Sequence, residues 1–366
     1  MLRVGITGVE GLIGWHLRIF LHSKDNVEVI GADRSTFLSE EKLQGFVSNV
    51  DVIVHLAGMN RGDDLEIEKT NVALSNQIIS ACNNTHRQPH IVFSSSTHAF
   101  GNTAYGRSKR LCAEIFRQWA DESGSVFTNL IIPHVFGEGG KPFYNSVVST
   151  FCYQLAHQQE PEIKYDGDLE LLHAQELSVR IWQLICKPED GELSLPGFRM
   201  KVSELLERLR KMAGLYDTNI IPHLDQEIDL CLFNTYRSYL FPKHYPVALV
   251  LHEDARGGLV EVVKTLHGGQ CFVSTTKPGV TRGNHYHTKK IERFLVLKGR
   301  AVILFRKMFS SQIHKFEVSG EVPQYIDIPT GHTHNITNVG DKDLVTLFWA
   351  HEIFDPDKPD TFKEMV

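Results

Sequence analysis

The sequence lacks several features that would place the chain in other protein classes. No run approaches the ~20 apolar residues of a membrane-spanning helix, so we expect no membrane contact. The six cysteines lie far apart without paired spacing, which favours free thiols in a reducing cytoplasm over a disulfide framework. No basic leader with an apolar core precedes the first strand pattern, and we therefore expect a cytoplasmic protein.

Basic surface stripes are also absent. The formal net charge is −6, and no segment interleaves Lys or Arg with aromatic residues, which argues against a nucleic-acid partner. The expected partner is instead a small molecule. At 366 residues, of which 42% are hydrophobic, the chain has the composition of a soluble globular protein and the length of two domains.

The first part of the chain alternates short apolar runs with amphipathic stretches. Strands are expected at 2–7, 27–31, 52–57 and 90–94, and helices at 12–23 and 71–81. This alternation predicts βαβ units and an α/β Rossmann fold, which is a doubly wound parallel sheet with helices on both faces.

The pattern becomes that of an all-β domain from residue 250 onward. Apolar and polar residues alternate between Gly and Pro turns at 294–297, 301–306 and 344–349. Such segments predict an antiparallel sandwich or barrel. We place the boundary at Tyr245-Pro246, because the residue before a proline avoids helix and the pattern changes there, which gives domains 1–245 and 246–366.

A glycine-rich turn follows the first strand. Gly8, Gly11 and Gly14 stand between a strand and a helix, where the bare backbone can approach a pyrophosphate and the helix N-terminus offers free N–H groups. About 20 residues further on, Asp33 suits ribose hydroxyls, whereas Arg34 beside it suits a 2′-phosphate. The turn predicts a dinucleotide, with both NADPH and NADH left open.

The clearest chemical signal is the pair Tyr105 and Lys109, which share one helix face and follow a serine run that includes Ser96. The ammonium can stabilise the ionised phenol and hold the cofactor ribose, while the phenol gives a proton to a carbonyl oxygen. A serine at a strand end can orient that carbonyl. Taken alone, the pair also fits an ordinary amphipathic helix with a surface lysine.

With His55, Asn71 and the segment Pro133–Gly137 in the expected order, these motifs resemble the extended short-chain dehydrogenase/reductase family over about two thirds of the chain. The resemblance implies a Rossmann fold, a nicotinamide cofactor and a nucleotide-sugar substrate. The catalytic residues that it implies are Ser96, Tyr105 and Lys109. The cofactor-binding residues that it implies are Thr7, Gly8, Gly11, Leu12, Ile13, Gly14, Asp33, Arg34, Leu56, Ala57, Gly58, Tyr105 and Lys109.

The C-terminal region holds a different set of residues. His285 and His287 are spaced so that both imidazoles face one side of a strand, and Glu292 and His334 follow. Three nitrogens and one oxygen can close around a divalent metal, for which Zn²⁺ is the first choice, with nickel, iron and manganese left open. These two motifs resemble the cupin family, which implies that all four residues bind the metal within a barrel.

Over its whole length the chain resembles the bifunctional capsular-polysaccharide UDP-sugar C3-epimerase/C4-reductases of the N-acetyl-L-fucosamine pathway. The resemblance implies a UDP-2-acetamido-2,6-dideoxy-4-keto-hexose substrate, a zinc-dependent epimerisation, reduction by NADPH and a homodimer. Epimerisation must come first, because reduction removes the ketone that makes the C3 proton acidic. His332 and Lys298 are candidate bases, and Arg256 is a candidate ligand of the diphosphate.

Two other functions stay open at this point. The chain could be a reductase whose metal domain is only structural, or a nucleotide-regulated sugar-binding protein with an inactive reductase site.

Overall fold

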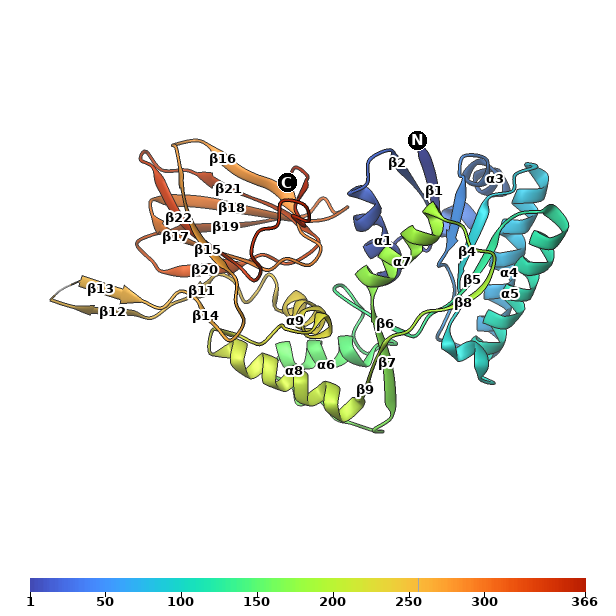
Figure 1. Cartoon of the computed structure of the whole chain (residues 1–366), viewed down its shortest axis with the longest axis horizontal. Coiled ribbons are helices and arrows are strands. Elements are labelled where there is room, and N and C mark those ends of the chain that lie inside the picture. The colour runs from blue at the N-terminus through green and yellow to red at the C-terminus, as the bar shows by residue number, and fades with distance from the viewer. Residues whose placement is uncertain (256) are drawn as a thin grey trace. The chain divides into compact units, whose positions relative to one another are not determined.

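The computed structural model describes residues 1–255 and 257–366, and the chain packs as two compact units (Figure 1). The first unit comprises Met1–Gly140 and Gly167–Lys201, and the second comprises Lys141–Asp166 and Val202–Val366. These units are defined by packing, and the helical segments at 141–166 and 202–245 pack with the C-terminal strands. The boundary at Tyr245-Pro246 concerns sequence modules and stays a prediction.

A six-stranded parallel sheet forms the centre of the first unit, in the order β2-β1-β3-β4-β5-β8. Its strands are β1 (Leu2–Thr7), β2 (Val27–Ala32), β3 (Val52–His55), β4 (His90–Ser94), β5 (Phe127–Ile131) and β8 (Gly191–Ser194). The central strands β3, β4 and β5 are buried along their whole length, as a sheet covered on both faces requires. The predicted Rossmann class is confirmed.

Helices cover both faces of this sheet (Figure 1). One face carries α3 (Glu40–Ser48), α4 (Asp64–Asn84) and α5 (Ala104–Ser123), and the other carries α1 (Leu12–His22) and α7 (Ala174–Cys186). Short elements complete the unit: α2 (Arg34–Phe37), η1 (Thr97–Phe100), and a small sheet of β6 (His134–Phe136), β7 (Asp168–His173) and β9 (Phe198–Lys201).

Helix α4 is longer than the predicted helix at 71–81. Asp63 caps its N-terminus by accepting hydrogen bonds from the backbone N–H groups of Leu65 and Glu66, so the helix begins at Asp64. The prediction used only the apolar periodicity, and the polar cap at Asp63 lies before the first residue of that pattern. Within the described residues, no helix is both long and apolar enough to cross a membrane, and all six cysteines are free thiols.

Two antiparallel five-stranded sheets form the barrel of the second unit, as predicted, and enclose a common apolar core. One sheet consists of β11 (Val247–Ala248), β20 (Gln324–Asp327), β17 (Glu292–Lys298), β22 (Leu344–Ala350) and β15 (Gln270–Thr276). The other consists of β19 (Ile313–Ser319), β18 (Arg300–Lys307), β21 (His332–Asn338), β16 (Thr281–Tyr286) and β23 (Phe362–Lys363). The unit also contains α6 (Val147–Ala156), α8 (Val202–Asp217), α9 (Glu227–Leu240), the hairpin β12 (Leu251–Asp254) and β13 (Gly257–Val260), and the pair β10 (Ile220–Ile221) and β14 (Lys264–Thr265).

A fully buried ion pair within the barrel is contacted by the helices of the same unit. Arg293 on β17 stands opposite Asp327 on β20, and two hydrogen bonds of 2.7 and 3.0 Å link the guanidinium to the carboxylate. Tyr216 of α8 donates to the same carboxylate, and Arg237 of α9 donates to the Ile328 carbonyl at 2.9 Å. Burial alone would raise the pKa of Asp327, but the Arg293 guanidinium holds it below its usual value of 3.8.

We expect Arg293→Met to lower the free energy of unfolding of the second unit by about 3–5 kcal/mol, because Asp327 would stay buried without its cation. Hydrogen exchange of peptides from β17 and β20 would measure the loss. The double variant Arg293→Met/Asp327→Leu should regain most of it, since no buried charge remains. An equal loss in the double variant would contradict this account.

The Arg293 and Asp327 pair also makes the stability of the second unit depend on pH. Because the pKa of Asp327 is lower in the folded than in the unfolded chain, its contribution to stability is complete above the unfolded value and is lost as pH falls through the folded one. Acid unfolding followed by circular dichroism should therefore be less steep in the double variant than in the natural chain.

Candidate functional site

The predicted cofactor residues come together at the carboxyl ends of three neighbouring strands. Thr7 pairs with Ala32 of β2 on one side and with His55 of β3 on the other, so β1, β2 and β3 end at one level. The strand order reverses between β1 and β3, and in open α/β sheets a ligand binds at such a switch point. The glycine turn, Asp33 and the segment 56–58 directly follow these ends.

Two glycines let the turn fold onto its neighbours. Gly8 has φ +71°, and a β-carbon there would lie 2.8 Å from the backbone nitrogen of Ala57. A β-carbon at Gly14 would lie 2.4 Å from the Gly8 carbonyl oxygen. Thr7 Oγ1 accepts the N–H groups of Leu56 and Ala57 at 3.2 and 3.1 Å, which holds the two loops together.

Helix α1 starts directly after this turn. Gly11 is its N-cap, Leu12 and Ile13 open its first turn, and no side chain of the described residues caps it by a hydrogen bond. The first N–H groups of the helix are therefore available to an anion, which is the arrangement that binds a pyrophosphate.

An acidic and a basic residue, Asp33 and Arg34, follow the end of β2. Asp33 caps α2, and its Oδ1 accepts from Ser35 Oγ at 2.8 Å and from Thr36 N at 3.0 Å. These hydrogen bonds hold the pKa of Asp33 below its usual value, so the group is ionised at neutral pH. Arg34 follows it and is exposed. The pair can meet a ribose hydroxyl or a 2′-phosphate.

The predicted catalytic pair lies on the first two turns of α5. Lys109 Nζ is 5.6 Å from the centre of the Tyr105 ring, so its charge can stabilise the ionised phenol. The lysine is buried and donates to the Ser94 carbonyl at 2.6 Å, which fixes the ammonium. Ser96 follows β4, and its Oγ accepts the backbone N–H of His98 at 3.2 Å. Its own hydroxyl hydrogen can then be donated to a substrate.

Two buried residues, Asn71 and His55, lie next to this site. Asn71 of α4 accepts from Met59 N at 2.6 Å and donates to Ser108 Oγ at 2.9 Å, which ties the loop after β3 to α5. Burial and the nearby Lys109 lower the pKa of His55 to about 3, so His55 is neutral and adds no second charge beside the ammonium.

One residue near Tyr105 carried no signal in the sequence. The ring of His98 lies 6.2 Å from the ring of Tyr105, edge to face, and the side chain is exposed. Its place two residues after Ser96 is the local feature that could have drawn attention to it.

The four predicted metal ligands gather inside the barrel. His285 of β16 is the cross-strand partner of His334 of β21, His287 follows the end of β16, and Glu292 opens β17. One donor atom from each lies within 4.8 Å of all the others. Glu292 Oε2 is 3.1 Å from Nε2 of His287 and 3.8 Å from Nε2 of His334.

The tautomers of these histidines fit a cation. The Nδ1 atoms of His287 and His334 lie 2.6 and 3.4 Å from the backbone carbonyls of Asp360 and His332, and a carbonyl can only accept, so each Nδ1 donates. The buried Nε2 lone pairs are left facing the Glu292 carboxylate, and within the described residues neither Nε2 has a hydrogen-bond partner. Two acceptors at this distance need a proton or a metal between them.

The charges of the cluster also suit a divalent metal. Burial and the neighbouring His287 lower the pKa of His285 to about 4, and burial lowers that of His334 as well. Burial alone would raise the pKa of Glu292, but the neighbouring His287 holds it at about 2. Burial would lower the pKa of His287, but the Glu292 carboxylate raises it, so without a metal this pair shares a proton. Three imidazoles with one carboxylate form a donor set that zinc accepts in place of that proton.

The other predicted residues of this end lie around the cluster. His332 is two residues before His334 on β21 and therefore on the same strand face, with its Nδ1 3.0 Å from the Thr330 carbonyl. Lys298 is exposed at the end of β17. Arg256 lies outside the described residues.

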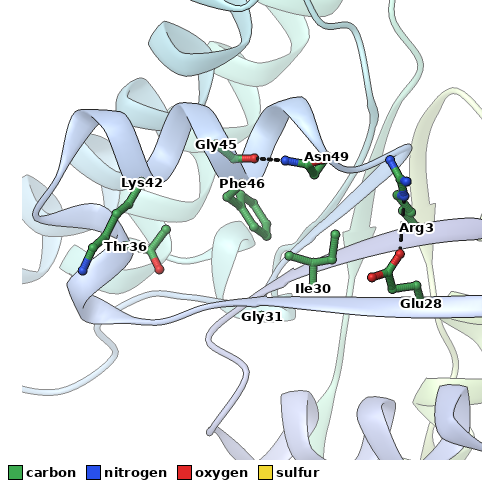
Figure 2. A pocket seen from close by; sticks show the side chains of 9 residues that line it. All are labelled: Arg3, Glu28, Ile30, Gly31, Thr36, Lys42, Gly45, Phe46 and Asn49. Atoms are coloured by element: carbon green, nitrogen blue, oxygen red, sulfur yellow. Dashed lines mark hydrogen bonds and ion pairs between the residues drawn. The ribbon is translucent and has the colours of Figure 1, made fainter.

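An open groove of about 520 Å³ lies beside the edge strand β2, under α3 (Figure 2). It is lined by Arg3, Glu28, Ile30, Gly31, Thr36, Lys42, Gly45, Phe46 and Asn49. An ion pair of 3.4 Å between Arg3 and Glu28 closes one end. None of the predicted cofactor, catalytic or metal residues lines this groove, so it belongs to neither site.

We expect Gly8→Ala to weaken nicotinamide nucleotide binding by about 10-fold or more, because the added methyl group meets backbone that cannot move away. Fluorescence titration with NADPH would measure it. Gly45→Ala in α3 is the matched control, since a β-carbon there meets nothing within 4 Å. Equal affinity of the two variants would count against the predicted turn.

Two family models match this chain. Residues 4–194 match the NAD dependent epimerase/dehydratase family, and residues 252–362 match the polysaccharide biosynthesis C-terminal domain. A spore coat polysaccharide biosynthesis protein of Bacillus subtilis, SpsL, is 27% identical over 31% of this chain and 81% of its own length.

Two relatives cover the whole chain. The UDP-2-acetamido-2,6-beta-L-arabino-hexul-4-ose reductase of Pseudomonas aeruginosa is 32% identical over 99% of this chain and 98% of its own. The crystal structure of the capsular polysaccharide assembling protein CapF of Staphylococcus aureus has a TM-score of 0.64 and 34% identity, with 100% of both chains covered. The chain therefore belongs to the NAD dependent epimerase/dehydratase family and is a homologue of these two proteins.

Proposed function

We propose that this protein epimerises a UDP-2-acetamido-2,6-dideoxy-4-keto-hexose at C3 and then reduces its C4 ketone with NADPH, toward UDP-N-acetyl-L-fucosamine. The observation that carries the proposal is the coexistence of two complete sets of residues. Ser96, Tyr105 and Lys109 belong to the first unit, and the histidine and glutamate cluster belongs to the second. The name of the Pseudomonas aeruginosa relative, a reductase of a hexul-4-ose, supports the substrate class.

The reduction uses groups of the first unit. A nicotinamide cofactor, when bound, supplies the hydride for C4. Tyr105 gives its phenolic proton to the C4 oxygen, and Ser96 donates a hydrogen bond to the same oxygen. The ammonium of Lys109 offsets the charge left on the phenol, since the Ser94 carbonyl holds it beside the Tyr105 ring. Arg34 at the end of β2 favours NADPH over NADH.

The epimerisation uses the cluster in the barrel. A divalent metal, for which we propose zinc, would polarise the C4 ketone and so acidify the C3 proton. His285, His287, Glu292 and His334 would hold it. His332 is the proposed base, because it lies on the same strand face as His334 and half-buried, whereas Lys298 is exposed.

A reductase with a purely structural metal domain is the second candidate. It is favoured by the name of the Pseudomonas aeruginosa relative, which states a reductase and no epimerase. Exchange of the C3 proton separates the two functions, since only an epimerase catalyses it. The homodimer implied by the sequence resemblance stays a prediction.

For Tyr105→Phe we expect NADPH oxidation with the keto-sugar to fall by about 10²-fold or more, because the proton donor is lost. Absorbance of the reduced nicotinamide measures it. Exchange of C3 hydrogen for deuterium should continue, since that reaction belongs to the other unit. Tyr165→Phe, at an exposed tyrosine, is the control. Unchanged oxidation in Tyr105→Phe would rule out Tyr105 as the proton donor, and no oxidation by the natural chain would favour the binding-protein alternative.

For Glu292→Gln we expect less bound metal and a loss of C3 exchange of about 10-fold or more, because the anionic ligand becomes neutral. Metal analysis of the dialysed protein and NMR of the sugar in deuterated buffer measure the two effects. NADPH binding should be unchanged. Normal C3 exchange together with metal loss would leave the metal a structural role.

A further inference from the structure

Residues 359–365 form a strap, so named here, along the edge of the sheet beside β16. Its strand β23 pairs with β16, and the register places Lys363 opposite His285 and Phe362 opposite Tyr286. Lys290, which is buried, donates from Nζ to the Pro359 carbonyl at 2.6 Å and to Thr361 Oγ1 at 3.2 Å. The strap is therefore fixed to the segment that carries two of the proposed ligands.

Asp360 is the centre of these contacts. Its carboxylate accepts the backbone N–H groups of Thr288, Lys289 and Lys290 at 3.0, 2.8 and 2.7 Å, and the Thr288 hydroxyl at 2.6 Å. These four hydrogen bonds organise the turn between β16 and β17. That turn connects His287 to Glu292, so its shape decides whether the two ligands meet.

The same residue reaches a ligand directly. The backbone carbonyl of Asp360 lies 2.6 Å from Nδ1 of His287. Because the carbonyl can only accept, it fixes the tautomer with the hydrogen on Nδ1 and leaves the Nε2 lone pair for the metal. The carboxylate of Asp360 holds the turn, and its carbonyl orients the imidazole, so one residue sets both position and tautomer.

The far end of the strap reaches the second motif. Thr333, the neighbour of His334, donates to the Glu364 carbonyl at 2.6 Å, and Glu364 N donates to the carbonyl of Asn284 at 3.0 Å. Arg306 of β18 binds the Glu364 carboxylate at 2.9 Å. The strap thus touches the immediate neighbours of His285 and His334 as well as His287 itself.

We propose that Asp360 is a positioning residue of the metal centre, and that the strap it anchors sets how tightly the metal is held. This inference rests on the proposed metal site. It adds a residue that lies outside both metal motifs and is 73 positions away from the ligand it orients. Partners that orient a ligating histidine typically change metal affinity by about 10–100-fold when removed.

The test is a competition between the full-length protein and a chromogenic chelator for Zn²⁺, together with the visible absorption of the Co²⁺-substituted protein. We expect Asp360→Ala to weaken Zn²⁺ affinity by about 10–100-fold and to alter the Co²⁺ spectrum, because the loss of the carboxylate frees the turn 288–290 and with it the position of His287 against the Asp360 carbonyl. Asp360→Asn, which keeps one side-chain acceptor, should restore part of the affinity. Asp357→Ala, at an exposed aspartate of the preceding segment, should match the natural chain.

The spectrum separates positioning from general stability, since a purely structural role would leave the ligand geometry of the bound metal unchanged. Natural affinity and spectrum in Asp360→Ala would overturn the proposal. If that variant does not fold, Thr288→Val removes one bond to the carboxylate at nearly constant shape, and we expect a smaller loss of affinity with the same spectral change. Thr288→Val with natural affinity and spectrum would likewise overturn it.

The result also distinguishes this inference from the proposed function. If the natural chain binds Zn²⁺ but exchanges no C3 proton, the epimerase proposal fails while the effect of Asp360 on affinity still stands. If the natural chain binds no Zn²⁺, Asp360 has no metal to position and both proposals fail.

Discussion

The buried ion pair between Arg293 and Asp327 joins β17 to β20 in the register that places Glu292 beside the three histidines. Glu292 immediately precedes Arg293 on β17, and Asp327 lies just before the segment that leads into β21 and His334. Successive residues of a strand face opposite sides, so a slip of one residue would turn Glu292 away from the histidines. Tyr216 of α8 donates to the Asp327 carboxylate, and Arg237 of α9 donates to the neighbouring Ile328 carbonyl, which explains why these helices pack with the barrel.

Each set of chemical groups is completed within its own unit. The glycine turn lies at the end of β1, and the tyrosine and lysine pair lies on α5 of the same unit. The proposed metal ligands come from β16, the turn after it, β21 and β17, all of them in the second unit. Under the proposed function, the keto-sugar that is epimerised in the second unit must then reach the first, and the chemistry gives the direction. Once the C4 ketone is reduced, the C3 proton is no longer acidic, so reduction ends the sequence.

Much of the fold and of the candidate sites was predictable from the sequence, because the signals are local. The glycine turn, the pair Tyr105 and Lys109, and the spacing of His285 and His287 each depend on one turn, helix or strand end, which the sequence displays directly. Asp360 was not predictable, since a carbonyl that orients an imidazole can belong to any residue. The packing of 202–245 with the barrel also depends on long-range contacts, such as that of Tyr216 with Asp327, which no periodicity reveals.

The most direct measurement incubates the natural chain with NADPH and a UDP-4-keto-6-deoxy-N-acetylhexosamine in deuterated buffer, with and without a metal chelator. Absorbance records cofactor oxidation, and NMR records deuterium at C3 of the product. The account predicts oxidation together with C3 deuterium, and the loss of that deuterium when chelator removes the metal. Oxidation that proceeds without C3 deuterium in the absence of chelator would contradict it, and would leave a reductase with a structural metal domain.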